Sequence, residues 1–159
     1  MSRWTGAWLP GTGTATADDV EQRYRGERLG LVEHGAGSVA SPPARLGAFV
    51  LDLIIAGLLA GLFVHANPAD TEAMWVQQIW GSAIWFVLTT IAVSLFGFTP
   101  GMAACGVRVA RVDGAAMVGP VRAIARTLLT VLIIPVVVWD RDYRGLHDKV
   151  AGTVMVRTR

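Results

Sequence analysis

The sequence predicts an all-α membrane protein that carries a small cytoplasmic β-sheet. Of its 159 residues, 53% are hydrophobic and only 16% are charged, whereas a soluble domain carries about 25% charged residues. Two apolar runs are long enough to cross a bilayer, and a third, shorter run contains a proline. We therefore expect two transmembrane helices followed by a Pro-broken third membrane segment, which either re-enters or spans the bilayer.

Residues 1–44 differ in composition from the rest of the chain. They are rich in Gly, Ala, Ser, Thr and Pro, and they contain no apolar run of signal-peptide length. Low hydrophobicity and scattered charge predict a largely disordered cytoplasmic tail. The four-residue spacing of Trp4 and Trp8, and the mixed segment YRGERLGL (24–31), leave open a short interfacial helix or a docking segment.

The membrane domain is expected to cover residues 45–159. Its first helix is predicted over residues 45–64, because a run of about 20 helical residues extends about 30 Å, the thickness of the hydrocarbon core. Pro42 and Pro43 are expected to discourage helix upstream of this run.

The second helix is predicted over residues 79–96. Trp75, Trp80 and Trp85 cluster toward its start, as in an interfacial aromatic belt. The helix is expected to end at GFTPG (97–101), because glycine and proline break helices.

The third membrane segment is predicted over residues 122–139. Its charge-free part begins at Thr127, is short for an upright span and contains Pro135. The excess of Arg before the first helix and over residues 97–126 places the N-terminus and this connection in the cytoplasm. A full third crossing would put the Lys and Arg residues that follow it outside, against this rule. We therefore favour a re-entrant segment in a multi-pass protein of the plasma membrane.

Two stretches predict the small sheet. GVRVARVDGAAMV (106–118) alternates around Asp113-Gly114, which is a β-hairpin signal. GTVMVR (152–157) supplies a further strand, and a third strand makes a small sheet more stable than a lone hairpin. The strands pair only if both stretches lie on the same side of the membrane.

Arg45 and Asp52 are the first candidates for a ligand site or a buried polar network. They lie two helical turns apart on nearly the same face, about 10.5 Å along the axis, which is too far for an ion pair but suits residues that flank a site. An Asp at a helix centre costs about 2.5–3.5 kcal/mol to insert. Asp52 therefore needs a partner, carries a proton or faces water; it is either a buried pair that fixes packing or an ion or ligand site. The candidate hydroxyl partners on the second helix are Ser82, Thr89, Thr90 and Ser94.

The block YRGLHDKVAGT (143–153) concentrates charge directly after the third segment. Its Asp148 is expected either to act as a structural clamp, which ties the last strand to the TPG turn or caps a helix, or to belong to the site. Arg144 and His147 are supporting candidates. The candidate partners of Asp148 are Arg108, Arg122 and Arg126.

No motif indicates an enzyme, a metal site or a cofactor. The three His and one Cys lack ligand spacing, and hydrolase, zincin, P-loop and dinucleotide-binding motifs are missing from the sequence. The net charge of +2 comes from basic residues beside the apolar runs. That placement indicates membrane topology rather than nucleic-acid binding.

Five blocks follow one another in the sequence: Arg45, Asp52, TPGMAACGVRV (99–109), RAIARTLL (122–129) and RGLHDKVAGTVMV (144–156). Together they resemble the RDD family of small bacterial membrane proteins, which is named for one Arg and two Asp. The resemblance implies that Asp148 is the second family Asp, that Thr99 and Gly101 support the site, and that the protein takes part in transport. The tail resembles those of actinobacterial members.

Two function classes follow. In the first, the protein transports a proton, a cation or a small ligand through a site at Asp52, and oligomerisation through GLLAG (57–61) completes a pathway that two helices are too few to enclose. In the second, the Arg and Asp residues fix the fold, and the protein is an accessory or assembly subunit of a larger membrane complex. In both, the lipid bilayer is a partner.

Overall fold

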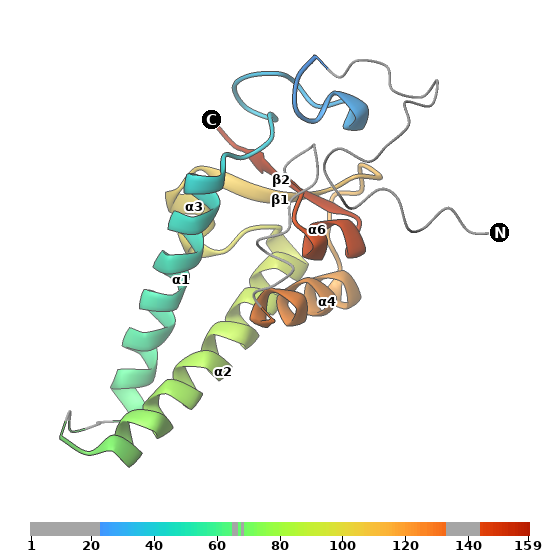
Figure 1. Cartoon of the computed structure of the whole chain (residues 1–159). Coiled ribbons are helices and arrows are strands. Elements are labelled where there is room, and N and C mark those ends of the chain that lie inside the picture. The colour runs from blue at the N-terminus through green and yellow to red at the C-terminus, as the bar shows by residue number, and fades with distance from the viewer. Residues whose placement is uncertain (1–22, 65–66, 68, 133–143) are drawn as a thin grey trace, which may run out of the picture.

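The computed structural model describes residues 23–64, 67, 69–132 and 144–159. Two long helices form a hairpin, and the remaining elements gather at one end of it (Figure 1). In chain order the elements are η1 (Glu27–Leu29), α1 (Pro42–Phe63), α2 (Thr71–Phe96), α3 (Pro100–Ala104), β1 (Val107–Arg111), α4 (Pro120–Val131), α6 (Leu146–Val150) and β2 (Thr153–Arg157).

The hairpin confirms the two predicted apolar helices, and α1 and α2 are both long enough and apolar enough to cross a membrane. Each helix starts earlier than expected. Pro42 and Pro43 occupy the first turn of α1, where a missing N–H costs nothing. Asp70 caps α2 by accepting hydrogen bonds from the backbone N–H groups of Glu72 and Ala73.

Small side chains let α1 and α2 approach closely. Ala56 and Ala60 are buried on α1, and a Cβ added at Gly81 of α2 would lie 3.9 Å from both Ala60 Cβ and Gly57 Cα. Within the GLLAG segment, Ala60 therefore packs against α2, whereas Gly57 and Leu58 are exposed. Outward-facing residues of the hairpin, such as Leu58, are exposed and apolar, as expected for contact with lipid.

The elements beyond the hairpin, α3, β1, α4, α6 and β2, form with residues 23–41 a unit that we call the headpiece. Strands β1 and β2 pair antiparallel, with Val107 opposite Arg157. Val39 bridges to Val156 of β2, and Ala40 N donates to Met155 O at 2.8 Å. The last residues of the expected tail thus lie along β2; residues 1–22 lie outside the described part of the chain.

The predicted hairpin around Asp113-Gly114 is wrong, although the strands at 107–111 and 153–157 are confirmed. Residues 112–119 contain no strand, and β1 pairs with β2 instead. This non-local pairing buries Val109 and Met155 in the core, which outweighs the local turn signal. The core lies where the hairpin meets the headpiece and contains Ala40, Ala48, Val93, Met102, Val107, Val109, Val118, Ala123 and Met155.

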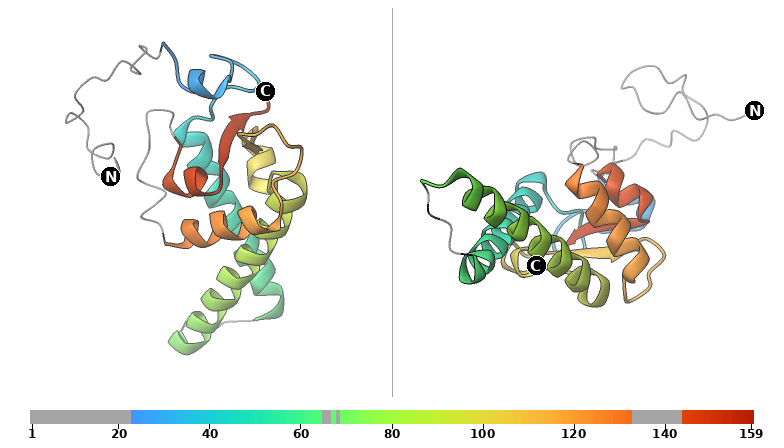
Figure 2. Two further views of the ribbon diagram at one scale, coloured as in Figure 1. Left: turned by 90° about the vertical axis from the view of Figure 1, so that its right-hand side faces the viewer. Right: turned by 90° about the horizontal axis from the view of Figure 1, so that it is seen from below.

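The first part of the predicted third membrane segment forms α4. In Figure 1 and in the left view of Figure 2, α4 runs across the hairpin rather than along it. Residues 133–143, with Pro135, lie outside the described residues, so the form of the segment beyond Leu132 stays a prediction.

Candidate functional site

Asp148 occupies the centre of a buried charge cluster. Its side chain is fully buried in α6. Arg126 of α4 donates to Oδ1, and Nη1 of Arg45, in the second turn of α1, lies 3.5 Å from Oδ2. One carboxylate therefore joins three helices that are far apart in the sequence.

The cluster extends to the sheet through Thr153 of β2. The Thr153 hydroxyl donates to Asp148 Oδ1 at 3.2 Å and lies 3.4 Å from Arg126 Nη1. Arg144 Nε donates to the carbonyl of the same threonine at 3.1 Å. His147 Nε2 lies 3.6 Å from Asp148 Oδ2, where a protonated imidazole would add a third cation. Thr153 was not predicted from the sequence, because a threonine in a strand does not by itself indicate a functional site.

Arg45 hydrogen-bonds to residues of the headpiece rather than to Asp52. Its Nε donates to Ala40 O at 3.1 Å, and its Nη2 donates to Met155 O at 3.4 Å. With its Asp148 contact, this one guanidinium reaches the segment before α1, the start of α6 and strand β2. The geometry does not bring Arg45 and Asp52 together as the flanks of one site.

Asp52 forms a second buried site, at the start of α3. The Thr99 hydroxyl donates to Oδ2, and the Gly101 N–H donates to Oδ1 at 2.8 Å. Thr99 Oγ1 also accepts from Met102 N at 3.2 Å, so it caps α3. The carboxylate thereby fixes the TPG turn against α1. Its hydrogen bonds go to this turn and not to the hydroxyl groups of α2 that we expected.

Asp52 and Gly101 are in tight contact. A Cβ at Gly101 would lie 2.7 Å from Asp52 Oδ1 and 2.8 Å from its Cγ. The Asp52 residue is only 8% exposed. The space beside this carboxylate is therefore filled by backbone, and both of its oxygens accept hydrogen bonds from the TPG turn.

A third charged group, on the surface, includes one expected site residue. Asp113 accepts from Arg111 Nε at 2.7 Å and from Arg122 Nη1 at 3.2 Å. The Arg111 guanidinium holds the pKa of the Asp113 carboxyl well below its usual range. Arg122 is thus paired with Asp113 and not with Asp148. The sequence signal for the pair of Arg111 and Asp113 is an Arg at the end of a strand followed two residues later by an Asp.

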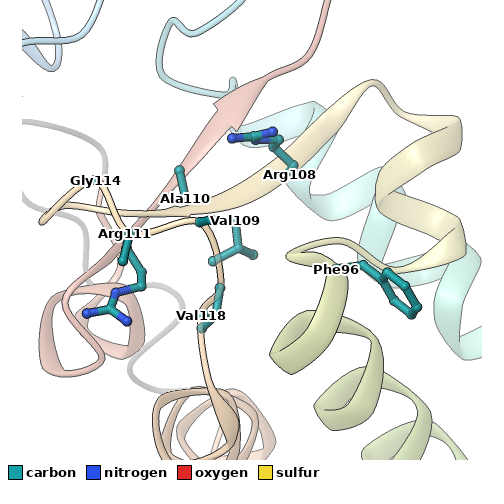
Figure 3. A pocket seen from close by; sticks show the side chains of 9 residues that line it. Phe96, Arg108, Val109, Ala110, Arg111, Gly114 and Val118 are labelled. Carbon is teal, nitrogen blue, oxygen red and sulfur yellow. The ribbon is translucent and has the colours of Figure 1, made fainter.

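Arg108, the remaining candidate, lies exposed on β1 and borders a shallow cavity of about 140 Å³ (Figure 3). Phe96, Val109 and Val118 line the cavity, and Arg108 and Arg111 point to different sides of the strand. Ligand pockets usually measure about 300–1,000 Å³, so this hollow does not qualify as one. Among the described residues no group of three or more His, Cys, Asp or Glu is placed to hold a metal.

Comparison with protein families gives one match: the model of the RDD family covers residues 39–152. No curated protein and no solved structure matches the chain. The matched range contains Arg45, Asp52, Asp148 and the arginines of α4, and thus both buried sites.

Proposed function

Because the chain belongs to the RDD family, and its buried acidic groups are bound by its own residues, we propose that it is a non-catalytic assembly subunit of the plasma membrane. In this proposal the hairpin anchors the protein, and the headpiece is held rigidly at the cytoplasmic surface for a larger membrane complex. The observation that supports this proposal is that both carboxylates are already hydrogen-bonded within the protein: Asp52 and Asp148 each accept hydrogen bonds on both oxygens.

The clamp role follows from the energetics of burial. A buried carboxylate that lacks partners costs several kcal/mol, and here Arg126 and Arg45 supply them. Because these residues come from α4 and α1, the ion pairs also set how the headpiece sits on the hairpin. A group that is committed to such a network is poorly placed to exchange a substrate.

The orientation is supported by charge. Every Lys and Arg in the described residues lies in the headpiece or at the start of α1, whereas the described residues that join α1 to α2 contain none. Basic residues favour the cytoplasmic side. We therefore place the headpiece and the N-terminus in the cytoplasm.

Transport remains the second candidate, because an ionisable group within a span marks a functional site by default. The hydrogen-bonded pair of Asp52 and Thr99 is the observation that favours it, since a carboxylate and a hydroxyl can pass a proton. Two helices do not enclose a pathway, so several copies are needed. Since α2 already covers Ala60 of GLLAG, the copies would meet through the exposed surfaces of the hairpin, which include Gly57 and Leu58.

The two functions are separated by proton and sodium flux in proteoliposomes, measured together with native mass in membrane-derived nanodiscs. The native protein is compared with Asp52→Asn and with Asp70→Asn, which changes the exposed cap of α2 at the other end of the hairpin. We expect no flux, and a complex that contains a different protein in fixed ratio. Flux that vanishes only in Asp52→Asn, from an oligomer of this chain, would overturn the assembly role and assign transport.

A further inference from the structure

Helix α4 carries an apolar stripe that the described part of the chain leaves uncovered. Spacings of three and four residues place its members on one face, and their exposure ranges from 42% to 78%. The two charged residues of α4 are Arg122 and Arg126, and neither belongs to this stripe. The stripe consists of Val121, Ile124, Leu128, Val131 and Leu132.

The stripe lies on the opposite side of α4 from Arg126. At about 100° per residue, Ile124 and Leu128 are rotated by about 160° and 200° from Arg126. Arg126 points to Asp148 of α6, and α6 lies on the headpiece side of α4 (Figure 1). The stripe therefore faces away from the rest of the headpiece, in the direction in which the hairpin extends.

The start of α4 is fixed at the end of a membrane span. Gly119, which precedes the helix, donates its N–H to Ser94 O at 3.2 Å, and Ser94 lies in the last turn of α2. Leu88, Ile91 and Leu95, spaced three and four apart on α2, are exposed. The apolar outer surface of the hairpin thus continues up to the level at which α4 leaves it.

We propose that α4 lies in the plane of the membrane interface, with its stripe in the boundary between headgroups and acyl chains of the bilayer that α1 and α2 cross. The occupant of the stripe is phospholipid. A helix with a polar face and an apolar face binds lipid in this way. Twelve residues extend about 18 Å, which is too short to cross the core of about 30 Å.

The lipid contact also explains how the clamp is arranged. The polar face of α4 is held by Asp148 and, through Arg122, by Asp113, so the helix is bound from the headpiece side and supported by lipid from the other. The headpiece then rests on the membrane through α4, in addition to its junction with the hairpin.

Nitroxide depth measurements test this proposal in the full chain. In a Cys105→Ala background, Val121→Cys, Ile124→Cys, Leu128→Cys and Val131→Cys are labelled singly. Each variant is reconstituted in phosphatidylethanolamine and phosphatidylglycerol vesicles. Leu58→Cys on α1 provides the acyl-chain reference and Glu33→Cys, which is exposed in the headpiece, provides the aqueous reference.

We expect oxygen to relax all four labels more strongly than a water-soluble nickel chelate does, at depths that differ by less than one helical turn, about 5.4 Å. Depth that increases by about 15 Å from Val121 to Val131 would show a helix that enters or spans the bilayer, and would overturn the proposal. Protection from both reagents would show a protein cover, and preferential nickel contact would show a stripe in water. Either of these results also excludes an interfacial helix.

Discussion

Arg126 and Asp148 form an ion pair that lies almost entirely out of water: the arginine side chain is 7% exposed and the carboxylate 0%. They belong to α4 and α6, so the pair fixes one short helix on another. Arg45 approaches the second carboxylate oxygen from α1. The Asp148 carboxylate therefore links α1 of the hairpin to α4 and α6 of the headpiece.

Loss of that charge is expected to destabilise the protein strongly. Asp148→Asn leaves two buried arginines without their counter-ion, which costs about 3–5 kcal/mol in comparable buried pairs. The check is the free energy of unfolding in mixed micelles, followed by tryptophan fluorescence. Asp113→Asn, whose ion pairs are on the surface, serves as the control and should change far less. Equal effects of the two variants would contradict the clamp.

The two arginines are expected to contribute unequally. Arg45 is 3.5 Å from the carboxylate and its side chain is 13% exposed, while Arg126 is in closer contact and less exposed. Double-mutant cycles with Asp148→Ala should give a larger coupling energy for Arg126→Ala than for Arg45→Ala, within the range of about 0.5–3 kcal/mol for contacting residues. A larger coupling for Arg45 would mean that α1, and not α4, holds the carboxylate.

A methyl group at Gly101 should be costly where the same change elsewhere is not. In Gly101→Ala the new Cβ meets the Asp52 carboxylate at 2.7–2.8 Å, and such overpacking costs about 1–3 kcal/mol. In Gly57→Ala the Cβ meets no atom within 4 Å. Thermal unfolding of both variants gives the comparison. Tolerance of Ala at position 101 would show that the TPG turn is not pressed against α1.

Replacing two buried threonines by valine is expected to have opposite effects on the stability of the protein. Thr99→Val removes the donor to Asp52 and the acceptor for Met102 N, and should cost about 1–3 kcal/mol. Thr90 Oγ1 is buried without a hydrogen-bond partner in the described structure, so Thr90→Val is expected to be neutral or stabilising. Unfolding free energies of the pair test the assignment, and a cost that is larger at position 90 would refute it.

The surface pair gives a pH dependence of known sign. The pKa of Asp113 is lowered in the folded protein, chiefly by its hydrogen bond from Arg111. The pair therefore stabilises the fold above the pKa of an unfolded Asp, about 3.9, and this contribution is lost as pH falls through the folded pKa. Carboxyl carbon NMR should show Asp113 ionised at about pH 3, where an ordinary Asp is mostly protonated. Arg111→Gln should raise the midpoint; an unchanged midpoint would remove Arg111 as the cause.

The hairpin could be predicted because its signal is local. Length and hydropathy alone define α1 and α2, and the errors at their starts come from capping, where Asp70 and the paired prolines extend each helix beyond its apolar run. For the sheet, the strands could be predicted from the sequence but their pairing could not. An Asp-Gly turn signal is local, whereas the choice of β2 as the partner of β1 depends on burial across the whole chain.

The candidate residues were found, but their pairing was not. Asp52 and Arg45 share a helix face in the sequence, yet Arg45 contacts a residue 103 positions away, and Asp52 bonds to a turn 47 and 49 positions away. Arg126 was one of three equal choices for Asp148. Residue type and spacing identify which groups need partners, while tertiary distance decides which partner each one gets.

The position of β2 between β1 and the bridge at Val39 has a consequence for biosynthesis. Val39 and Val156 pair across the chain, and at about 5–20 residues per second the ribosome needs roughly 6–23 s to make the residues between them. During that time Val39, β1 and the first arginine of the clamp are already made while their partner strand and carboxylate do not yet exist. The hairpin is therefore synthesised before its headpiece can close, and a chain that stops short of β2 leaves β1 and Val39 without their partner strand.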